Sequence, residues 1–210
     1  MKCYFGYYRF SEDLDFTFIS QKEFEKKSES QIRKIISEKI NNISKIVEEI
    51  SKKIGLDFKP DKKDHRHFEF GGGNKFTTLK LWYTPEDSKK ETYIKVQINF
   101  VEKLFYPVKE IHANNVFFGK YDNFQLAFAL PKEYEWLLKI PNMKCYSLEE
   151  ILVEKVRAIL TRKGVKGRDF LDVFLIVNQN KINLDDFKEN ILKKIEFALK
   201  YEKYSINLSN

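Results

Sequence analysis

Apolar side chains recur at spacings of three and four from residue 24 to residue 54, and this pattern constrains the fold more than any other. Lys, Glu and Ser occupy the positions between them, so one face of the segment is apolar and the opposite face is polar. The segment predicts one long amphipathic helix that ends at Gly55, with Asn41 and Asn42 as the place where it could break. The apolar positions are Ile32, Ile35, Ile36, Ile40, Ile43, Ile46, Val47, Ile50 and Ile54.

Segments with β-strand periodicity flank this helix. Residues 9–18 precede it, and residues 67–83 and 93–100 follow it. In residues 93–100 apolar and polar side chains alternate without exception, which is typical of a strand with one buried face. Residues 84–92 are polar and predict an exposed hairpin loop, and residues 124–130 predict a further strand.

The pattern changes to helical from Ser147 onward. Ser147 with Glu150, and Asn183 with Asp186, have the spacing of capping boxes, and they predict helices over residues 148–162 and 184–201. A very apolar segment, residues 168–177, predicts a third helix between them. We therefore predict two domains: residues 1–140, strand-rich with the helix at 24–54 inserted, and a helical C-terminal lobe of residues 141–210 packed on that core.

Composition excludes several classes of protein. A hydrophobic share of 42% excludes a disordered chain, and the densest apolar run, residues 173–177, is too short to span a membrane. The N-terminus shows no secretory signal, and the two cysteines, Cys3 and Cys145, form no disulfide framework, so we expect a cytoplasmic protein. The net charge of +7 is compatible with a polyanionic partner such as RNA, and equally with lysines on solvated helix faces.

Two carboxylates on the first predicted strand are candidates for chemistry. Asp13 and Asp15 are separated by one residue, so on a strand they lie on the same face, about 6 to 7 Å apart. Leu14 and Phe16 are then expected to be buried on the opposite face. This spacing suits divalent cations that share oxygen ligands and bind a triphosphate, although a solvated strand face explains the same pair.

Three blocks of sequence together resemble one protein family. RFSEDLDF at residues 9–16, SLEEILVEKVRAILTR at residues 147–162 and RDFLD at residues 168–172 are similar, in this order, to motifs of the AbiEii/AbiGii-type toxin nucleotidyltransferases. The resemblance implies the nucleotidyltransferase fold of the DNA polymerase beta type. This is an α/β (α+β) fold with a small mixed β-sheet flanked by helices and a helical C-terminal lobe.

The resemblance also implies a metal and substrate site. Asp13 and Asp15 would hold Mg²⁺, as a two-metal site, together with a nucleoside triphosphate. Arg9 and Ser11, which begin the same block, would contact the substrate.

Lys155 is the clearest candidate in the second block. It lies four residues after Ile151 and four before Ile159, so its stem runs along an apolar stripe and its amine needs a partner or must reach the rim. By resemblance, Lys155 matches the active-site lysine of the family, which is expected near the nucleotide phosphates.

The third block carries two acids. Asp169 lies near a predicted helix N-terminus, where the helix dipole stabilises an acid without any function. By resemblance, Asp169 matches the family's catalytic acid and Asp172 is the second candidate. Arg168 would face the phosphates from the same corner.

Two features depart from the family's pattern. A Gly-Gly-Thr or Gly-Ser motif that binds phosphate normally precedes the first block, and residues 1–8 contain neither. Gln97 stands on a strand face where members often carry an acid, and an amide cannot act as a base. Lys95 shares that face, and both side chains can still hydrogen-bond substrate. Either the true start lies upstream of Met1, or the protein is a degenerate member.

Three functions follow from these observations. The resemblance implies transfer of a nucleoside monophosphate to an acceptor hydroxyl, with RNA or tRNA as the expected acceptor. Such an enzyme would be a toxin of a toxin–antitoxin or phage-defence system, with an antitoxin as partner. The alternative is a catalytically degenerate protein that binds nucleotide, RNA or a partner protein, and a third is a general basic RNA binder.

Overall fold

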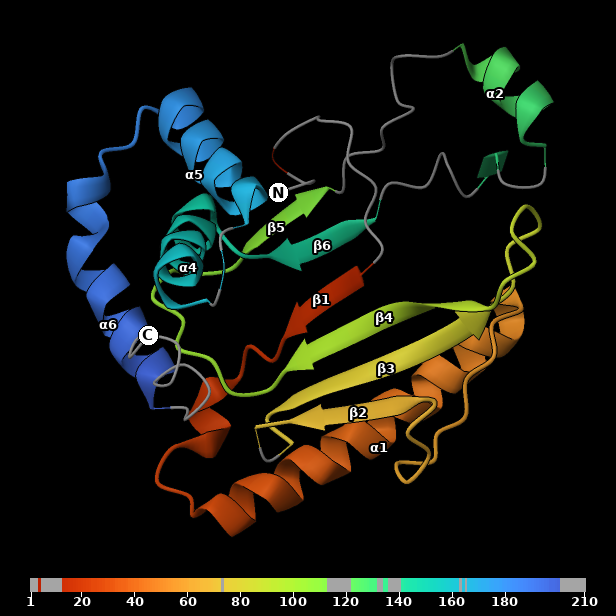
Figure 1. Cartoon of the computed structure of the whole chain (residues 1–210), viewed down its shortest axis with the longest axis horizontal. Helices are drawn as coiled ribbons and strands as arrows, with labels where there is room; N and C mark the ends of the chain where they lie inside the picture. The colour runs from red at the N-terminus through yellow and green to blue at the C-terminus, as the bar shows by residue number, and fades with distance from the viewer. Residues whose placement is uncertain are drawn as a thin grey trace. The chain divides into compact units, whose positions relative to one another are not determined.

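The computed structural model describes residues 4, 13–72, 74–112, 122–131, 134–135, 141–162, 164 and 166–200 (Figure 1). Its internal contacts divide the chain into two units. Residues 10–103 form one, called here the sheet unit, and residues 1–9 with 104–210 form the other, called here the helical unit.

The sheet unit contains a four-stranded sheet in the order β1-β4-β3-β2. The strands are β1 (Asp13–Thr17), β2 (Phe68–Gly71), β3 (Phe76–Tyr83) and β4 (Thr92–Asn99). β1 runs parallel to β4, whereas β2 with β3 and β3 with β4 are antiparallel. The predicted mixed sheet is confirmed, and the polar segment between β3 and β4 is the connection of a hairpin.

The long helix α1 (Glu29–Ile54) is present and continuous through Asn41 and Asn42. It begins later than predicted, because Ser28 forms a capping box with Gln31 and a separate 3₁₀ turn, η1 (Gln21–Phe24), precedes it. It ends at Gly55, whose φ of 76° is the left-handed conformation that glycine adopts most readily.

One hydrophobic core holds α1 against a face of this sheet (Figure 1). Ile36 and Ile40 of α1 are buried there. The strands and loops contribute Phe58, Phe68, Leu79, Leu81, Val96, Ile98 and Phe100, and η1 contributes Phe24. This arrangement leaves Lys80 of β3 and Lys95, Gln97 and Asn99 of β4 on the opposite face of the sheet.

Leu14 and Phe16 are not buried, so the prediction for them is wrong. They are 49% and 47% exposed. They pair with Val96 and Ile98 in the register of β1 with β4, which places them on the core side of the sheet. β1 is an edge strand, however, and the core centres on α1 with the three other strands, so the core does not extend over these two side chains.

The helical unit combines a short hairpin with helices. β5 (Lys109–His112) pairs antiparallel with β6 (Asn142–Cys145). The helices are α2 (Asn123–Ala129), α4 (Leu148–Thr161), α5 (Gly167–Asn180) and α6 (Lys188–Leu199), with the 3₁₀ turn η2 (Leu184–Phe187) before α6. The three predicted C-terminal helices are present. Within the part of the chain that the structure describes, no helix is long and apolar enough to cross a membrane.

The contacts divide the chain near residue 103, whereas the sequence analysis placed the boundary at residue 140. The pairing of β5 with β6 accounts for the difference. It joins residues 109–112 to residues 142–145, so the chain enters the helical unit well before its first long helix.

The predicted strand at residues 124–130 is wrong, because this segment forms α2. Apolar residues at every second position, Phe124, Leu126 and Phe128, gave the appearance of a strand. The Asp122 carboxylate accepts a hydrogen bond from the Phe124 backbone N–H and caps a helix, and the alanines in this segment favour helix.

A buried ion pair joins α6 to α4. Lys194 Nζ lies 2.7 Å from Glu150 Oε1, and both side chains are almost fully buried. Glu150 Oε2 also accepts hydrogen bonds from the backbone N–H groups of Phe105 and Tyr106 at 2.8 and 2.9 Å. The Glu150 side chain therefore binds elsewhere and does not complete the predicted capping box, although Ser147 caps the helix through the Glu150 N–H.

Replacing Lys194 by Met should destabilise the protein, because the buried Glu150 carboxylate loses its counter-charge. We expect a loss of about 3 kcal/mol in the free energy of unfolding, measured by urea denaturation. The double variant Glu150→Gln, Lys194→Met should recover most of it, since a neutral amide can still accept the two backbone hydrogen bonds. A single variant as stable as the wild type would contradict this account.

Candidate functional site

Asp13 and Asp15 lie on the face of the sheet opposite α1. In the register of β1 with β4, Asp13 pairs with Lys95 and Asp15 pairs with Gln97, so the four side chains share one face. Lys95 Nζ is 3.9 Å from Asp13 Oδ1, and Asp13 is 41% exposed. The strand therefore presents two carboxylates on an accessible polar surface, with a cation beside the first and an amide beside the second.

The chemistry of this donor set fits a hard divalent cation. Carboxylate and amide oxygens are ligands that Mg²⁺ accepts, and Asp13, Asp15 and Gln97 offer both kinds on adjacent strands. Among the residues that the structure describes, no group of three or more His, Cys, Asp or Glu side chains gathers into a metal cluster. A metal at this face would thus depend on the carboxylate pair and on oxygen atoms from the substrate and water.

A second polar cluster lies between α4 and α5 in the helical unit. Lys155 Nζ is 2.8 Å from Asp169 Oδ1 and 2.8 Å from Asp172 Oδ2. The two acids are one helical turn apart, which aims both at the same ammonium group. Their side chains are only 3% and 1% exposed. The partner that the position of Lys155 demands is therefore this pair of acids.

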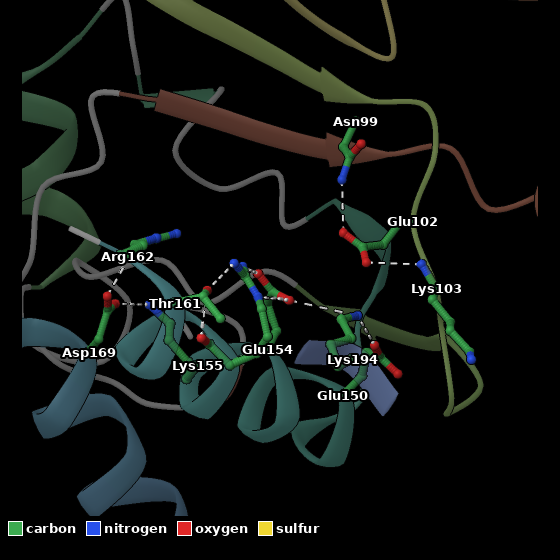
Figure 2. Close-up of polar contacts among 11 residues, drawn as sticks. Asn99, Glu102, Lys103, Glu150, Glu154, Lys155, Thr161, Arg162, Asp169 and Lys194 are labelled. Atoms are coloured by element: carbon green, nitrogen blue, oxygen red, sulfur yellow. Dashed lines mark hydrogen bonds and ion pairs between the residues drawn. The ribbon is translucent and has the colours of Figure 1, made fainter. Parts of the chain in front are cut away.

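Arg162 belongs to the same cluster, and the sequence analysis gave it no role. It is the C-cap residue of α4, and its Nη1 donates to Asp169 Oδ2 at 3.1 Å. Figure 2 shows Asp169 between Lys155 and Arg162. The signal was present in the sequence, because Arg162 follows Lys155 by two helical turns and so projects from the same side of α4.

The electrostatics of this cluster keep Asp169 ionised. Burial by itself would raise the pKa of Asp169, but the hydrogen bond and charge of Lys155 and the charges of Arg162 and Arg168 together hold it below its ordinary value of 3.8. Arg168 is exposed, so it acts through its charge at the edge of the cluster. Asp169 therefore remains an anion at neutral pH.

Buried polar contacts continue along α4 beyond this cluster (Figure 2). Arg157 Nη1 donates to Thr161 Oγ1 at 3.1 Å, and its Nε donates to Glu154 Oε2 at 3.3 Å. Glu154 Oε2 in turn lies 3.7 Å from Lys194 Nζ. α4 thus carries the Lys155 cluster on one side and the Lys194 network on another.

The structure describes most of the predicted site residues. Lys95 and Gln97 lie with the carboxylate pair in the sheet unit, and Lys155, Arg168, Asp169 and Asp172 lie together in the helical unit. Arg9 and Ser11 fall outside the described residues. The described candidates therefore form two groups, one in each unit.

A small mixed sheet with a long helix packed on one face, and a carboxylate pair on a strand that runs parallel to its neighbour, is consistent with an α/β protein of the nucleotidyltransferase fold. The family model described as "Nucleotidyl transferase AbiEii toxin, Type IV TA system" matches residues 1–209. The chain therefore belongs to the AbiEii nucleotidyltransferase toxin family, which implies a nucleotide substrate and an antitoxin partner. No curated protein and no solved structure matches the chain.

The stabilising effect of Asp169 should depend on pH. Because its pKa is lowered in the folded protein, its ionised form stabilises the fold above the ordinary value of 3.8, and this contribution is lost as pH falls through the folded pKa. We expect Asp169→Asn to lower the free energy of unfolding by about 2 kcal/mol at pH 7. Urea denaturation should show this difference shrinking below pH 3.8. Asp186→Asn, an exposed acid of η2, is the control, and a difference independent of pH would contradict the prediction.

Proposed function

We propose that this protein transfers a nucleoside monophosphate from a nucleoside triphosphate to an acceptor hydroxyl, with release of pyrophosphate, and that it acts as a toxin of a toxin–antitoxin or phage-defence system. The observation that carries the proposal is the position of Asp13 and Asp15. Both carboxylates lie on the polar face of β1, beside the Lys95 and Gln97 side chains of β4. Two neighbouring carboxylates on one accessible face are suited to hold a divalent cation that binds a triphosphate, which supports the proposal.

The proposed cofactor is Mg²⁺, held by Asp13 and Asp15. When bound, a divalent cation neutralises charge on the phosphates and lowers the barrier to phosphoryl transfer. The two carboxylates would hold this cation, and the Gln97 amide beside Asp15 can donate a hydrogen bond to the nucleotide or accept one from it. A second ion at this pair stays a prediction that only metal counting can test.

The cluster of Lys155, Arg162, Asp169 and Asp172 is the proposed phosphate-binding group of the helical unit. Two cations and two acids are held there in a largely buried arrangement, and the exposed Arg168 adds positive charge beside it. Such a preorganised group of charges can bind the phosphates without reorganisation when the reaction begins. This is its proposed role.

RNA, and tRNA in particular, is the proposed acceptor. The chain carries a net charge of +7, which supports association with a polyanion. A 3′-terminal hydroxyl of RNA supplies the nucleophile that the proposed reaction requires. Because charge does not identify a partner, the acceptor must be found by experiment.

One observation favours a second function. Gln97 stands directly beside Asp15, where a third acid would complete a metal site or accept the proton of the attacking hydroxyl. A chain without that acid can still bind nucleotide or RNA and yet transfer nothing. This alternative is a catalytically degenerate member of the family that binds a nucleotide, an RNA or a partner protein.

The two functions can be separated by a transfer assay. The wild type should move label from one of the four α-labelled nucleoside triphosphates to total tRNA in the presence of Mg²⁺. The double variant Asp13→Asn, Asp15→Asn should reduce transfer at least about 100-fold, because it removes the carboxylates that hold the metal. Mn²⁺ binding followed by electron paramagnetic resonance should fall in the same variant.

The matched control is Asp185→Asn, Asp186→Asn, which changes the net charge equally at two exposed acids of η2. It should transfer label as the wild type does. A folded wild type that labels no RNA with any nucleotide would overturn the enzymatic proposal in favour of the binding function. Equal transfer by the wild type and the Asp13, Asp15 variant would place the chemistry elsewhere.

A further inference from the structure

The charge of Lys155 is already matched within the protein. Its ammonium group lies 2.8 Å from one oxygen of Asp169 and 2.8 Å from one oxygen of Asp172. Both acids are almost fully buried, so water screens these interactions little. The ammonium keeps one N–H donor and the side chain is 22% exposed, but an incoming phosphate would bring a third anion to a cation that two buried carboxylates already hold.

Arg162 is differently placed. Its side chain is 38% exposed, and it meets the cluster through Nη1 alone, at 3.1 Å from Asp169 Oδ2. Within the described part of the chain, this is the one ion pair of Arg162. A guanidinium carries five N–H donors in a planar fork, so donors remain for a second anion while the contact with Asp169 is kept.

Asp169 holds Arg162 in place for such a contact. One carboxylate oxygen, Oδ1, receives Lys155, and the other, Oδ2, receives Arg162. Because Lys155 is also bound by Asp172, the carboxylate of Asp169 cannot rotate freely, and the guanidinium beside it is oriented in turn. The contacts therefore run from Asp172 to Lys155, from Lys155 to Asp169, and from Asp169 to the exposed guanidinium of Arg162.

We propose that Arg162 is the residue of this cluster that binds phosphate groups, and that Lys155 is a positioning residue that acts through Asp169. The proposal rests on the proposed function for the identity of the ligand, a nucleoside triphosphate. It assigns a phosphate contact to a residue at the C-terminal end of α4 and removes that contact from the lysine. Arg168, also exposed, adds positive charge nearby, but among the described residues no side-chain contact orients it on the cluster.

The test measures phosphate binding apart from nucleotide transfer. Inorganic tripolyphosphate is titrated into the full chain by calorimetry in metal-free buffer, so that a metal at Asp13 and Asp15 contributes nothing. Arg162→Gln should weaken tripolyphosphate binding about tenfold or more, because it removes a charge-assisted, bidentate contact. Arg162→Lys should recover only part of the affinity. Arg33→Gln, which removes the same charge from an exposed position of α1, should bind as the wild type does.

Unfolding measurements separate binding from positioning. Arg162→Gln should leave the urea midpoint nearly unchanged, since its ion pair is partly exposed. Lys155→Met should lower the midpoint clearly, because two buried acids lose their shared counter-charge. A Lys155→Met protein that keeps wild-type stability but loses tripolyphosphate binding would make the lysine the direct contact and overturn the proposal.

Two further results would also overturn it. One is binding by Arg162→Gln equal to that of the wild type, and the other is a wild type that does not bind tripolyphosphate. The proposed function fails separately. A wild type that binds tripolyphosphate through Arg162 but labels no RNA in the transfer assay would retain the phosphate site and lose the enzymatic function.

Discussion

The parallel pairing of β1 with β4 is the constraint on which the sheet unit depends. Parallel neighbours cannot be joined by a tight turn, so the chain must cross the sheet between them. α1 begins that crossing and packs on one face, and the β2–β3 and β3–β4 hairpins return the chain to β4. The pairing also sets Asp13 beside Lys95 and Asp15 beside Gln97. The same contact thus explains the topology and brings the polar candidates together.

Buried charge organises the helical unit. Its apolar core is small, with Leu152 and Ile176 fully buried, and α4 carries acidic and basic side chains into the surrounding interface. Lys194 with Glu150 joins α4 to α6, and Lys155 with Asp169 and Asp172 joins α4 to α5. Such pairs add little stability compared with an apolar core, but breaking one is costly. They therefore specify which helices pack together, and one of them also orients a candidate substrate contact.

Local patterns predicted the parts of this fold that local forces determine. The period of the isoleucines and the glycine at position 55 gave α1 and its end, and strict alternation gave β4. The short strands β5 and β6 have no pattern of their own, because four residues pair only through a distant partner. Residues 124–130 show the opposite error, in which a local pattern predicted a strand that does not form. The capping Asp122 and the alanines of this segment favour the helix more strongly than the alternating apolar residues favour a strand. The alternation of Leu14 and Phe16 predicted their face of the sheet correctly, but they lie on an edge strand that the core does not cover.

For the candidate site residues, too, spacing predicted what depends on local structure and missed what depends on packing. Asp13 and Asp15 could be placed on one face from spacing alone, and the position of Lys155 on an apolar stripe correctly demanded a partner. Spacing could not say that this partner is a pair of acids already within the protein, because that depends on the packing of α5 on α4. In our proposal, Lys155 holds the two acids and does not bind the ligand, and Arg162 is the ligand contact. This distinction rests on burial, since Lys155 is 22% exposed and Arg162 is 38% exposed, and not on residue type.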